Sequence, residues 1–357
     1  MTEFNIKNKL VLLNSFLLFF VSCKTLEKNS IQGAVVSARE EASKIGVEIL
    51  KKGGNAFDAM VATSFALTVV FPNAGNITGG GFMVYRTLKG DIGSLDYRET
   101  APLSSSEKMY LDEQGEANKD LSRTGGLAVG IPGSVAGILE VHEKMGSLPL
   151  KDLIQPSIEL AKAGFTVTEK QAQSLNNKRD EFIKVNGKNT FYGKTFKKGD
   201  TIKNPNLANA LIEISKHGNK GFYEGWVAES MVKKINKTGG NVSLEDFRSY
   251  EPKWRSPIVF YYKDLKVISM GPPSSGGICL AQMMKMVEPY NIGDLKYKSH
   301  KALHLMIEAE RRSYADRSFF LGDPDFVSIP KYHLISSDYL SERMLNYNPL
   351  LASKSSD

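Results

Sequence analysis

An arginine that follows a run of three glycines is the clearest candidate for chemistry in this sequence. Gly79–Gly81 stand just before an apolar segment, and Arg98 closes the strand-like segment after it. Consecutive glycines of this kind indicate backbone packed too closely for a Cβ atom. Arg98 then extends from rigid backbone, and its planar guanidinium can bind a carboxylate through two parallel hydrogen bonds. From the residues alone, an internal ion pair with Asp96 or Glu99 explains Arg98 equally well.

Two other patterns resemble known sites but fit them poorly. Gly187–Thr195 has the glycines, lysine and threonine of a phosphate-binding loop, but the spacing between its glycines is one residue too long and no apolar strand precedes it. His300, His304 and Glu308 recur every fourth residue, a spacing at which two histidines can bind zinc. No glutamate follows the first histidine as in metalloproteases, so we favour a structural helix. A Gly-x-Ser-x-Gly nucleophile elbow does not occur.

The elements that must position these residues follow from hydrophobic periodicity and from glycine and proline breaks. The pattern predicts a helical, lysine-rich stretch over 169–216, a short helix starting at Ser243, and further helices over 40–52, 59–70, 134–145, 150–163, 227–238, 278–290 and 299–319. It predicts a buried strand at 35–38 and two β-hairpins, 82–87 with 92–97 and 256–262 with 265–270. So few strands for so many helices indicates that part of the sheet comes from sequence outside this chain. From about 336 onward we expect a polar tail.

Composition is that of an ordinary globular protein with a sizeable core: 357 residues, 41% hydrophobic and 24% charged. The net charge of +7 comes from scattered lysines and arginines among acidic residues, which is typical of a solvated basic surface, so we expect no nucleic-acid partner. Cys279, the one cysteine of the body, stands between apolar neighbours and is predicted to be a buried, inert thiol.

The N-terminus has the pattern of an export signal. Lys7 and Lys9 precede a short apolar run, so residues 1–22 are predicted to be a signal peptide and 23–357 the mature region. Val21-Ser22-Cys23 resembles a bacterial lipobox, which predicts that Cys23 is lipidated, although Phe20 departs from the usual aliphatic residue. A plain cleaved signal with an incidental cysteine is the alternative. We expect export in a bacterium, to the periplasm or as a membrane-anchored lipoprotein that touches the membrane only through its lipid.

Six motifs, in order along the chain, resemble the gamma-glutamyltranspeptidase (glutathione hydrolase) family: Gly53–Ala59, Pro72–Met83, Asp96–Pro102, Gly130–Gly137, Pro272–Gly277 and Tyr314–Val327. The similarity runs from about Ala34 to Pro330. It implies an α+β fold, the four-layer αββα fold of the N-terminal-nucleophile hydrolases, incomplete without a small subunit. It implies no cofactor and no metal. The Pro272–Gly277 motif is interpreted as structural.

The resemblance also implies a mechanism. A proenzyme cuts itself into a large and a small subunit, and the cut frees a threonine whose hydroxyl attacks a γ-glutamyl amide such as that of glutathione. Water, an amino acid or a dipeptide then takes the γ-glutamyl group. Arg98 matches the family arginine that holds the substrate α-carboxylate. The threonine is expected beyond Asp357, so we expect no catalytic residue in this chain, which alone would be inactive. A related β-lactam acylase and a truncated, non-catalytic lipoprotein are the alternatives.

Overall fold

The computed structural model describes residues 33–355 as a mixture of helices and short antiparallel sheets. Residues from Ser37 onward belong to one unit, and every element named here lies within it. Among the described residues, no helix is both long and apolar enough to cross a membrane. The predicted signal peptide and Cys23 lie outside the described residues.

Helices α2 and α3 form from the most strongly patterned part of the chain. α2 (Glu40–Lys51) is amphipathic and ends at a glycine turn, where Gly53 has a φ of +90°. α3 (Ala56–Val70) begins with a capping box, in which the side chains of Asn55 and Asp58 each bind the other's backbone N–H. Because α3 is apolar nearly all round, it is buried on most sides. Both predicted helices are confirmed.

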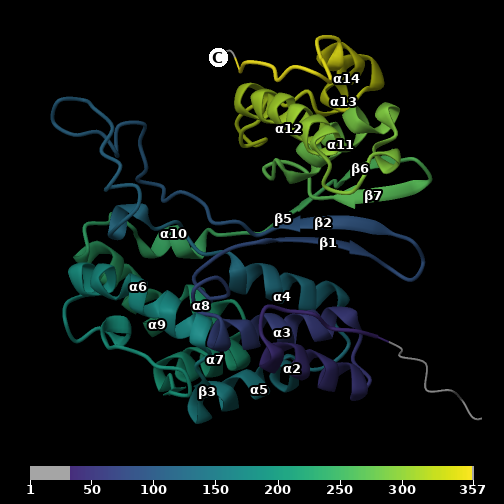
Figure 1. Cartoon of the computed structure of the whole chain (residues 1–357). Coiled ribbons are helices and arrows are strands. Elements are labelled where there is room, and N and C mark those ends of the chain that lie inside the picture. The colour runs from purple at the N-terminus through teal and green to yellow at the C-terminus, as the bar shows by residue number, and fades with distance from the viewer. Residues whose placement is uncertain (1–32, 356–357) are drawn as a thin grey trace, which may run out of the picture. The chain divides into compact units, whose positions relative to one another are not determined.

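The central sheet has three antiparallel strands in the order β1-β2-β5. β1 (Phe82–Arg86) and β2 (Ile92–Asp96) form the predicted hairpin, and β5 (Lys253–Arg255) pairs with the other edge of β2. At the end of β2, Asp96 lies opposite Lys253. Figure 1 shows α3 and α4 (Ser134–Met145) on one side of this sheet and α11 (Gly276–Val287) and α12 (His300–Phe320) on the other. The end of β2, the middle strand, and the residues that follow it therefore lie between two groups of helices.

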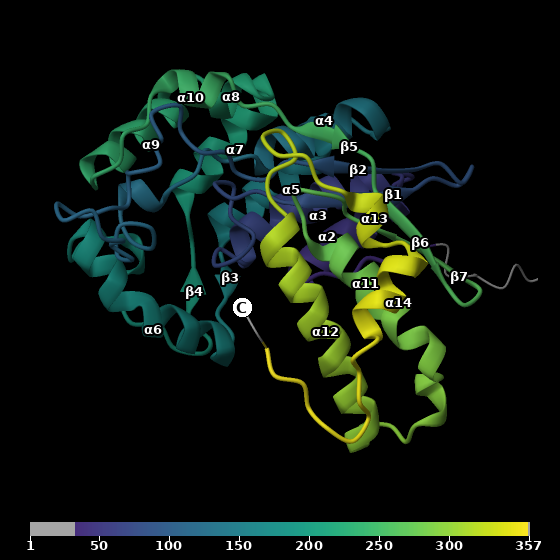
Figure 2. The same ribbon diagram turned by 90° about the horizontal axis from the view of Figure 1, so that it is seen from above.

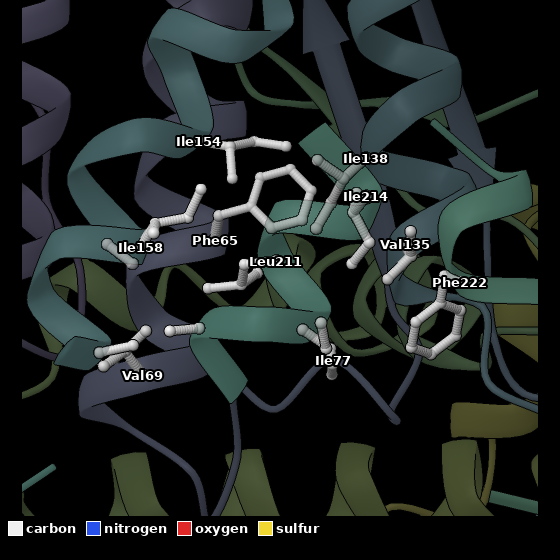
Figure 3. Close-up of a cluster of buried hydrophobic side chains, with 14 of the residues drawn as sticks. Phe65, Val69, Ile77, Val135, Ile138, Ile154, Ile158, Leu211, Ile214 and Phe222 are labelled. Carbon is white, nitrogen blue, oxygen red and sulfur yellow. The ribbon is translucent and has the colours of Figure 1, made fainter. Parts of the chain in front are cut away.

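Helices on the α3 side build the larger core. They are α4 (Ser134–Met145), α5 (Leu150–Ala163), α6 (Glu169–Asn186), α7 (Pro205–His217), α8 (Lys220–Tyr223), α9 (Gly225–Lys237) and α10 (Leu244–Arg248), with 3-10 turns at Gly126–Ala128 and Phe191–Gly193 and a small sheet of β3 (Phe165–Thr166) and β4 (Thr201–Ile202). Figure 3 shows Phe65 of α3 at the centre, facing Ile154 of α5 and Leu211 of α7. Burying one such side chain stabilises the fold by about 1.5–3 kcal/mol.

The C-terminal part of the chain builds a separate core around the second predicted hairpin, β6 (Ile258–Tyr262) and β7 (Leu265–Ser269). α11 packs on β6 and against α12, as Figure 2 also shows. The helices of this part are α11 (Gly276–Val287), α12 (His300–Phe320), α13 (Lys331–Leu334) and α14 (Ser337–Met344), with 3-10 turns at Glu288–Tyr290 and Ile292–Asp294. Cys279 of α11 is 5% exposed, which confirms the predicted buried thiol.

Three predictions of local structure differ from what is observed. Residues 35–38 form no strand: Val36 is 93% exposed, and no described strand pairs with this segment. The stretch 169–216 is two helices, α6 and α7, separated by turns at Gly187 and Gly199, which both have positive φ. The segment after Ser336, expected as a polar tail, begins with α14, which buries two apolar side chains against α11 and α12.

Candidate functional site

The backbone that carries Arg98 is packed directly against the triple glycine. A Cβ atom on Gly80 would lie 2.7 Å from the backbone N of Glu99, and one on Gly81 would lie 2.7 Å from the ring of Tyr97. Both positions therefore require glycine, as the sequence predicted. Gly79 does not, because the nearest atom to its Cβ would be 3.7 Å away. Instead, the Gly79 carbonyl accepts the first backbone N–H groups at the start of α4.

Two hydrogen bonds hold the main chain of Arg98 in place. Its N–H donates to Asp96 Oδ1 at 3.0 Å, and its carbonyl accepts the hydroxyl of Tyr250 at 2.8 Å. Burial raises the pKa of Tyr250, and the charges of Asp96 and Glu99 raise it further, so the hydroxyl stays protonated as a donor. The peptide group on each side of the Arg98 Cα atom is thus fixed.

The side chain of Arg98 is free by comparison. It is exposed, and its guanidinium carbon lies 5.9 Å from the centroid of the Phe82 ring. Within residues 33–355 the guanidinium makes no ion pair, and the internal pairs with Asp96 or Glu99 are not formed. Asp96 is bound instead by Arg255. Arg98 therefore presents an uncompensated, forked cation on rigid backbone.

This cation faces a cavity of about 610 Å³ between the segment after β2 and the segment after α12. Charged and hydroxyl side chains dominate its lining, which consists, in chain order, of Asp96, Arg98, Glu99, Thr100, Tyr250, Glu251, Lys253, Arg255, Pro273, Ser274, Ser275, Arg317, Ser318, Leu321, Gly322, Asp323 and Asp325. Such a lining suits a small, charged, polar ligand. Ser274 and Ser275 belong to the Pro272–Gly277 motif, which therefore reaches the cavity rather than serving the fold alone.

A partly buried ion network in the cavity wall is not indicated by any pattern in the sequence. Arg255 donates from Nε to Asp96 Oδ2 at 2.9 Å, and its two Nη atoms donate to the two oxygens of Asp325 at 2.9 and 2.8 Å. Lys253 adds a contact to Asp325 at 2.7 Å. Hydrogen bonds from Arg255 hold the pKa of Asp325 well below its ordinary value, and those from Lys253 lower it further. No spacing rule links residues so far apart in sequence.

The other sequence candidates do not gather at this cavity. Gly187–Thr195 follows the end of helix α6 and contains a 3-10 turn, so the strand that a phosphate loop needs is not there in the described structure. Glu308 is bound by Arg311 and Arg312, while His304 Nε2 lies 3.9 Å from it. Among residues 33–355, no three His, Cys, Asp or Glu side chains are grouped so that they could hold a metal ion.

Comparisons with known proteins agree on one family. A sequence model described as Gamma-glutamyltranspeptidase matches residues 42–356. The glutathione hydrolase proenzyme of Escherichia coli (strain K12) is 41% identical over 312 residues, 86% of this chain and 54% of that protein. The acylase ACY 1 proenzyme of Pseudomonas sp. (strain SE83) is 33% identical over 331 residues, 90% of this chain and 59% of that protein. The chain thus spans about half the length of the curated relatives it matches.

The likeness extends to structure. The crystal structure of Helicobacter pylori gamma-glutamyltranspeptidase superimposes with a TM-score of 0.88 at 42% identity, over 91% of this chain and 95% of that chain. The mixed α+β arrangement described above is therefore that of solved gamma-glutamyltranspeptidases. The solved chain is matched almost end to end, whereas the curated proenzymes are matched over about half their length.

Proposed function

This chain belongs to the gamma-glutamyltranspeptidase family, and we propose that it is the large-subunit portion of an enzyme that cleaves γ-glutamyl amides such as glutathione. The nucleophile is a threonine on a small subunit made from the same precursor, outside residues 1–357. Two observations support this division: the chain spans 54% of a homologous proenzyme, and it spans 95% of a solved chain of the family. The small subunit would also add the strands that complete a four-layer αββα fold.

In this proposal the reaction has two steps. The threonine hydroxyl attacks the γ-glutamyl amide, with the threonine's own α-amine as general base, and the amine of the leaving peptide departs. Water, an amino acid or a dipeptide then attacks the γ-glutamyl ester and releases the threonine. This chain contributes binding and orientation, which can lower a barrier by holding the reacting amide in one geometry.

The state of Arg98 is the observation that carries the proposal. An exposed guanidinium with no ion partner in the described structure, on backbone held by two hydrogen bonds, faces a polar cavity of suitable size. The α-carboxylate of a γ-glutamyl group is planar and accepts two parallel hydrogen bonds from such a fork. A lysine in the same place offers a point charge and no fork. Arg98 therefore orients the substrate by its α-carboxylate.

The test uses the chain assembled with its small subunit and L-γ-glutamyl-p-nitroanilide as donor. Arg98→Lys should raise KM about tenfold or more with a smaller change in kcat, because one charge-assisted hydrogen bond of roughly 1.5–3 kcal/mol is lost. Arg86→Lys is the matched control, since Arg86 is an exposed arginine at the far end of β1. An unchanged KM in Arg98→Lys refutes the role of Arg98.

Two other outcomes would replace the proposal. The acylase relative raises the alternative of a β-lactam side-chain acylase, and a preference for a glutaryl amide over the γ-glutamyl amide would favour it. Arg98 alone does not separate these substrates, because a glutaryl group keeps the terminal carboxylate of a γ-glutamyl group and lacks only its α-amine, so the two amides are compared directly. Absence of any turnover by the correctly assembled protein would favour a non-catalytic product.

We further propose that the protein is exported and anchored to a bacterial membrane through a lipid on Cys23. The basic start, short apolar run and Val21-Ser22-Cys23 support this. Cells grown with radiolabelled palmitate should yield a labelled protein, and Cys23→Ser should remove the label and release the protein from the membrane fraction. Cys279→Ser is the matched control, because that thiol is buried. Label that persists in Cys23→Ser contradicts the proposal.

A further inference from the structure

The carboxylate of Asp96 joins two hydrogen bonds that serve different parts of the cavity wall. Oδ1 accepts the backbone N–H of Arg98 at 3.0 Å, and Oδ2 accepts Nε of Arg255 at 2.9 Å. The side chain of Asp96 is 8% exposed and that of Arg255 is 15% exposed. A carboxylate with so little access to water needs its cation, because an unpaired buried charge costs several kcal/mol. Arg255 therefore fixes the oxygen that fixes Arg98.

Arg255 also reaches across the cavity to the segment that follows α12. Its forked end binds both oxygens of Asp325, in the planar, bidentate geometry that only arginine can supply. The carbonyl of Arg255 accepts the hydroxyl of Ser94, so its main chain is tied to β2 as well. One side chain thus connects the sheet, the Arg98 backbone and the loop around Asp325, and all three line the same cavity.

We propose that Arg255 and Asp325 are positioning residues for substrate recognition, acting through Asp96 on Arg98. The inference rests on the proposed function, in which Arg98 binds the α-carboxylate of a γ-glutamyl donor. Neither residue touches the substrate. Arg255 holds the Asp96 carboxylate in the rotamer that accepts the Arg98 N–H, and Asp325 holds the fork of Arg255. Loss of either lets the Arg98 peptide shift, and the guanidinium no longer meets both carboxylate oxygens.

Two donors separate this role from a general structural one. L-γ-glutamyl-p-nitroanilide carries the α-carboxylate, and 4-aminobutyryl-p-nitroanilide is the same donor with that carboxylate replaced by hydrogen. The ratio of their kcat/KM values in the assembled enzyme measures carboxylate recognition alone. We expect Arg255→Met and Asp325→Asn each to lower this ratio about tenfold, mainly through KM for the carboxylate-bearing donor. Arg86→Met, in the same sheet but remote from the cavity, should leave it unchanged.

A double-mutant cycle completes the test. If Arg255 acts through Arg98, Arg255→Met should add almost nothing to the ratio once Arg98→Ala is present. A structural role would lower both donors alike, leave the ratio at its wild-type value, and overturn the inference. If the Arg255→Met variant does not assemble with the small subunit, the donor ratio of Asp325→Asn tests the inference instead. Asp325 is partly exposed, and asparagine has the same shape as aspartate. If Arg98→Ala itself leaves the ratio unchanged, the proposed role of Arg98 fails and this inference with it.

Discussion

Replacing Glu308 with glutamine should destabilise the protein in a way that disappears at low pH. The Glu308 side chain is 3% exposed on α12 and accepts hydrogen bonds from Arg312, from Arg311 at 3.3 Å and from the backbone N–H of Ser353 at 3.0 Å. Burial alone raises the pKa of Glu308, but these hydrogen bonds, that from Arg312 foremost, outweigh it and lower the pKa to about 2. The charged carboxylate is therefore strongly favoured in the folded state.

The size and sign of the effect follow from linkage. The ordinary pKa of the group is 4.5, so its stabilisation is fully present above that pH and is lost as pH falls towards about 2. The difference between the two pKa values corresponds to at most about 3 kcal/mol at neutral pH. Glutamine keeps the shape but removes the charge, and it leaves Arg312, itself 2% exposed, without its anion. Breaking a buried pair in this way costs roughly 3–5 kcal/mol, which is a similar size.

Urea denaturation followed by circular dichroism at pH 7, 5, 4 and 3 measures this directly. We expect Glu308→Gln to lower the free energy of unfolding by about 3 kcal/mol at pH 7, and the gap to wild type to narrow between pH 4.5 and 3. Glu310→Gln is the control, because Glu310 is exposed on the same helix. Other carboxylates titrate in both proteins and cancel in the difference. A gap that is the same at pH 3 and pH 7 would refute the charge-based account.

Two further substitutions test the packing that supports the site. Gly137→Ala should lower the free energy of unfolding by about 1–3 kcal/mol, because a Cβ there would overlap the Tyr97 ring; an unchanged denaturation midpoint would show that the ring can move aside. Phe65→Ala should cost about 3–5 kcal/mol, because it empties the centre of the larger core. Val36→Ala, at an exposed position, should change the free energy of unfolding by less than about 0.5 kcal/mol. Equal effects of Phe65→Ala and Val36→Ala would contradict the assignment of the core.

Local patterns were sufficient to predict most elements of the fold. α4 and α5 have the predicted bounds, and both hairpins form, because alternation and helical periodicity are properties of neighbouring residues. The segment 35–38 has strand composition but no partner among residues 33–355, and a strand needs a partner to form. α14 was missed because its burial depends on the surfaces of α11 and α12, which no local pattern describes.

The candidate site likewise contains residues that local sequence patterns identify and residues that only tertiary packing brings together. Gly80, Gly81 and Arg98 could be singled out because glycine requirements and an arginine at a strand end are visible in sequence. Arg255 and Asp325 could not, because their pairing depends on how β5 and the loop after α12 approach each other. The sequence also left open whether Arg98 pairs with Asp96. In the structure the two side chains do not pair, and Oδ2 of Asp96 accepts a hydrogen bond from Arg255 instead.

Rigid backbone with a loosely held side chain would lower the energetic cost of the carboxylate binding that we propose for Arg98. Ordering a free arginine side chain costs up to about 2 kcal/mol, whereas ordering a flexible loop would add roughly 1–2 kcal/mol for each residue fixed. Here the backbone is already fixed by Gly80, Gly81 and two peptide hydrogen bonds, so only the side-chain cost remains. The Phe82 ring restricts the guanidinium further through a cation–π contact. A bidentate, charge-assisted pair with a carboxylate can offset a cost of that size, but not that of ordering the whole segment as well.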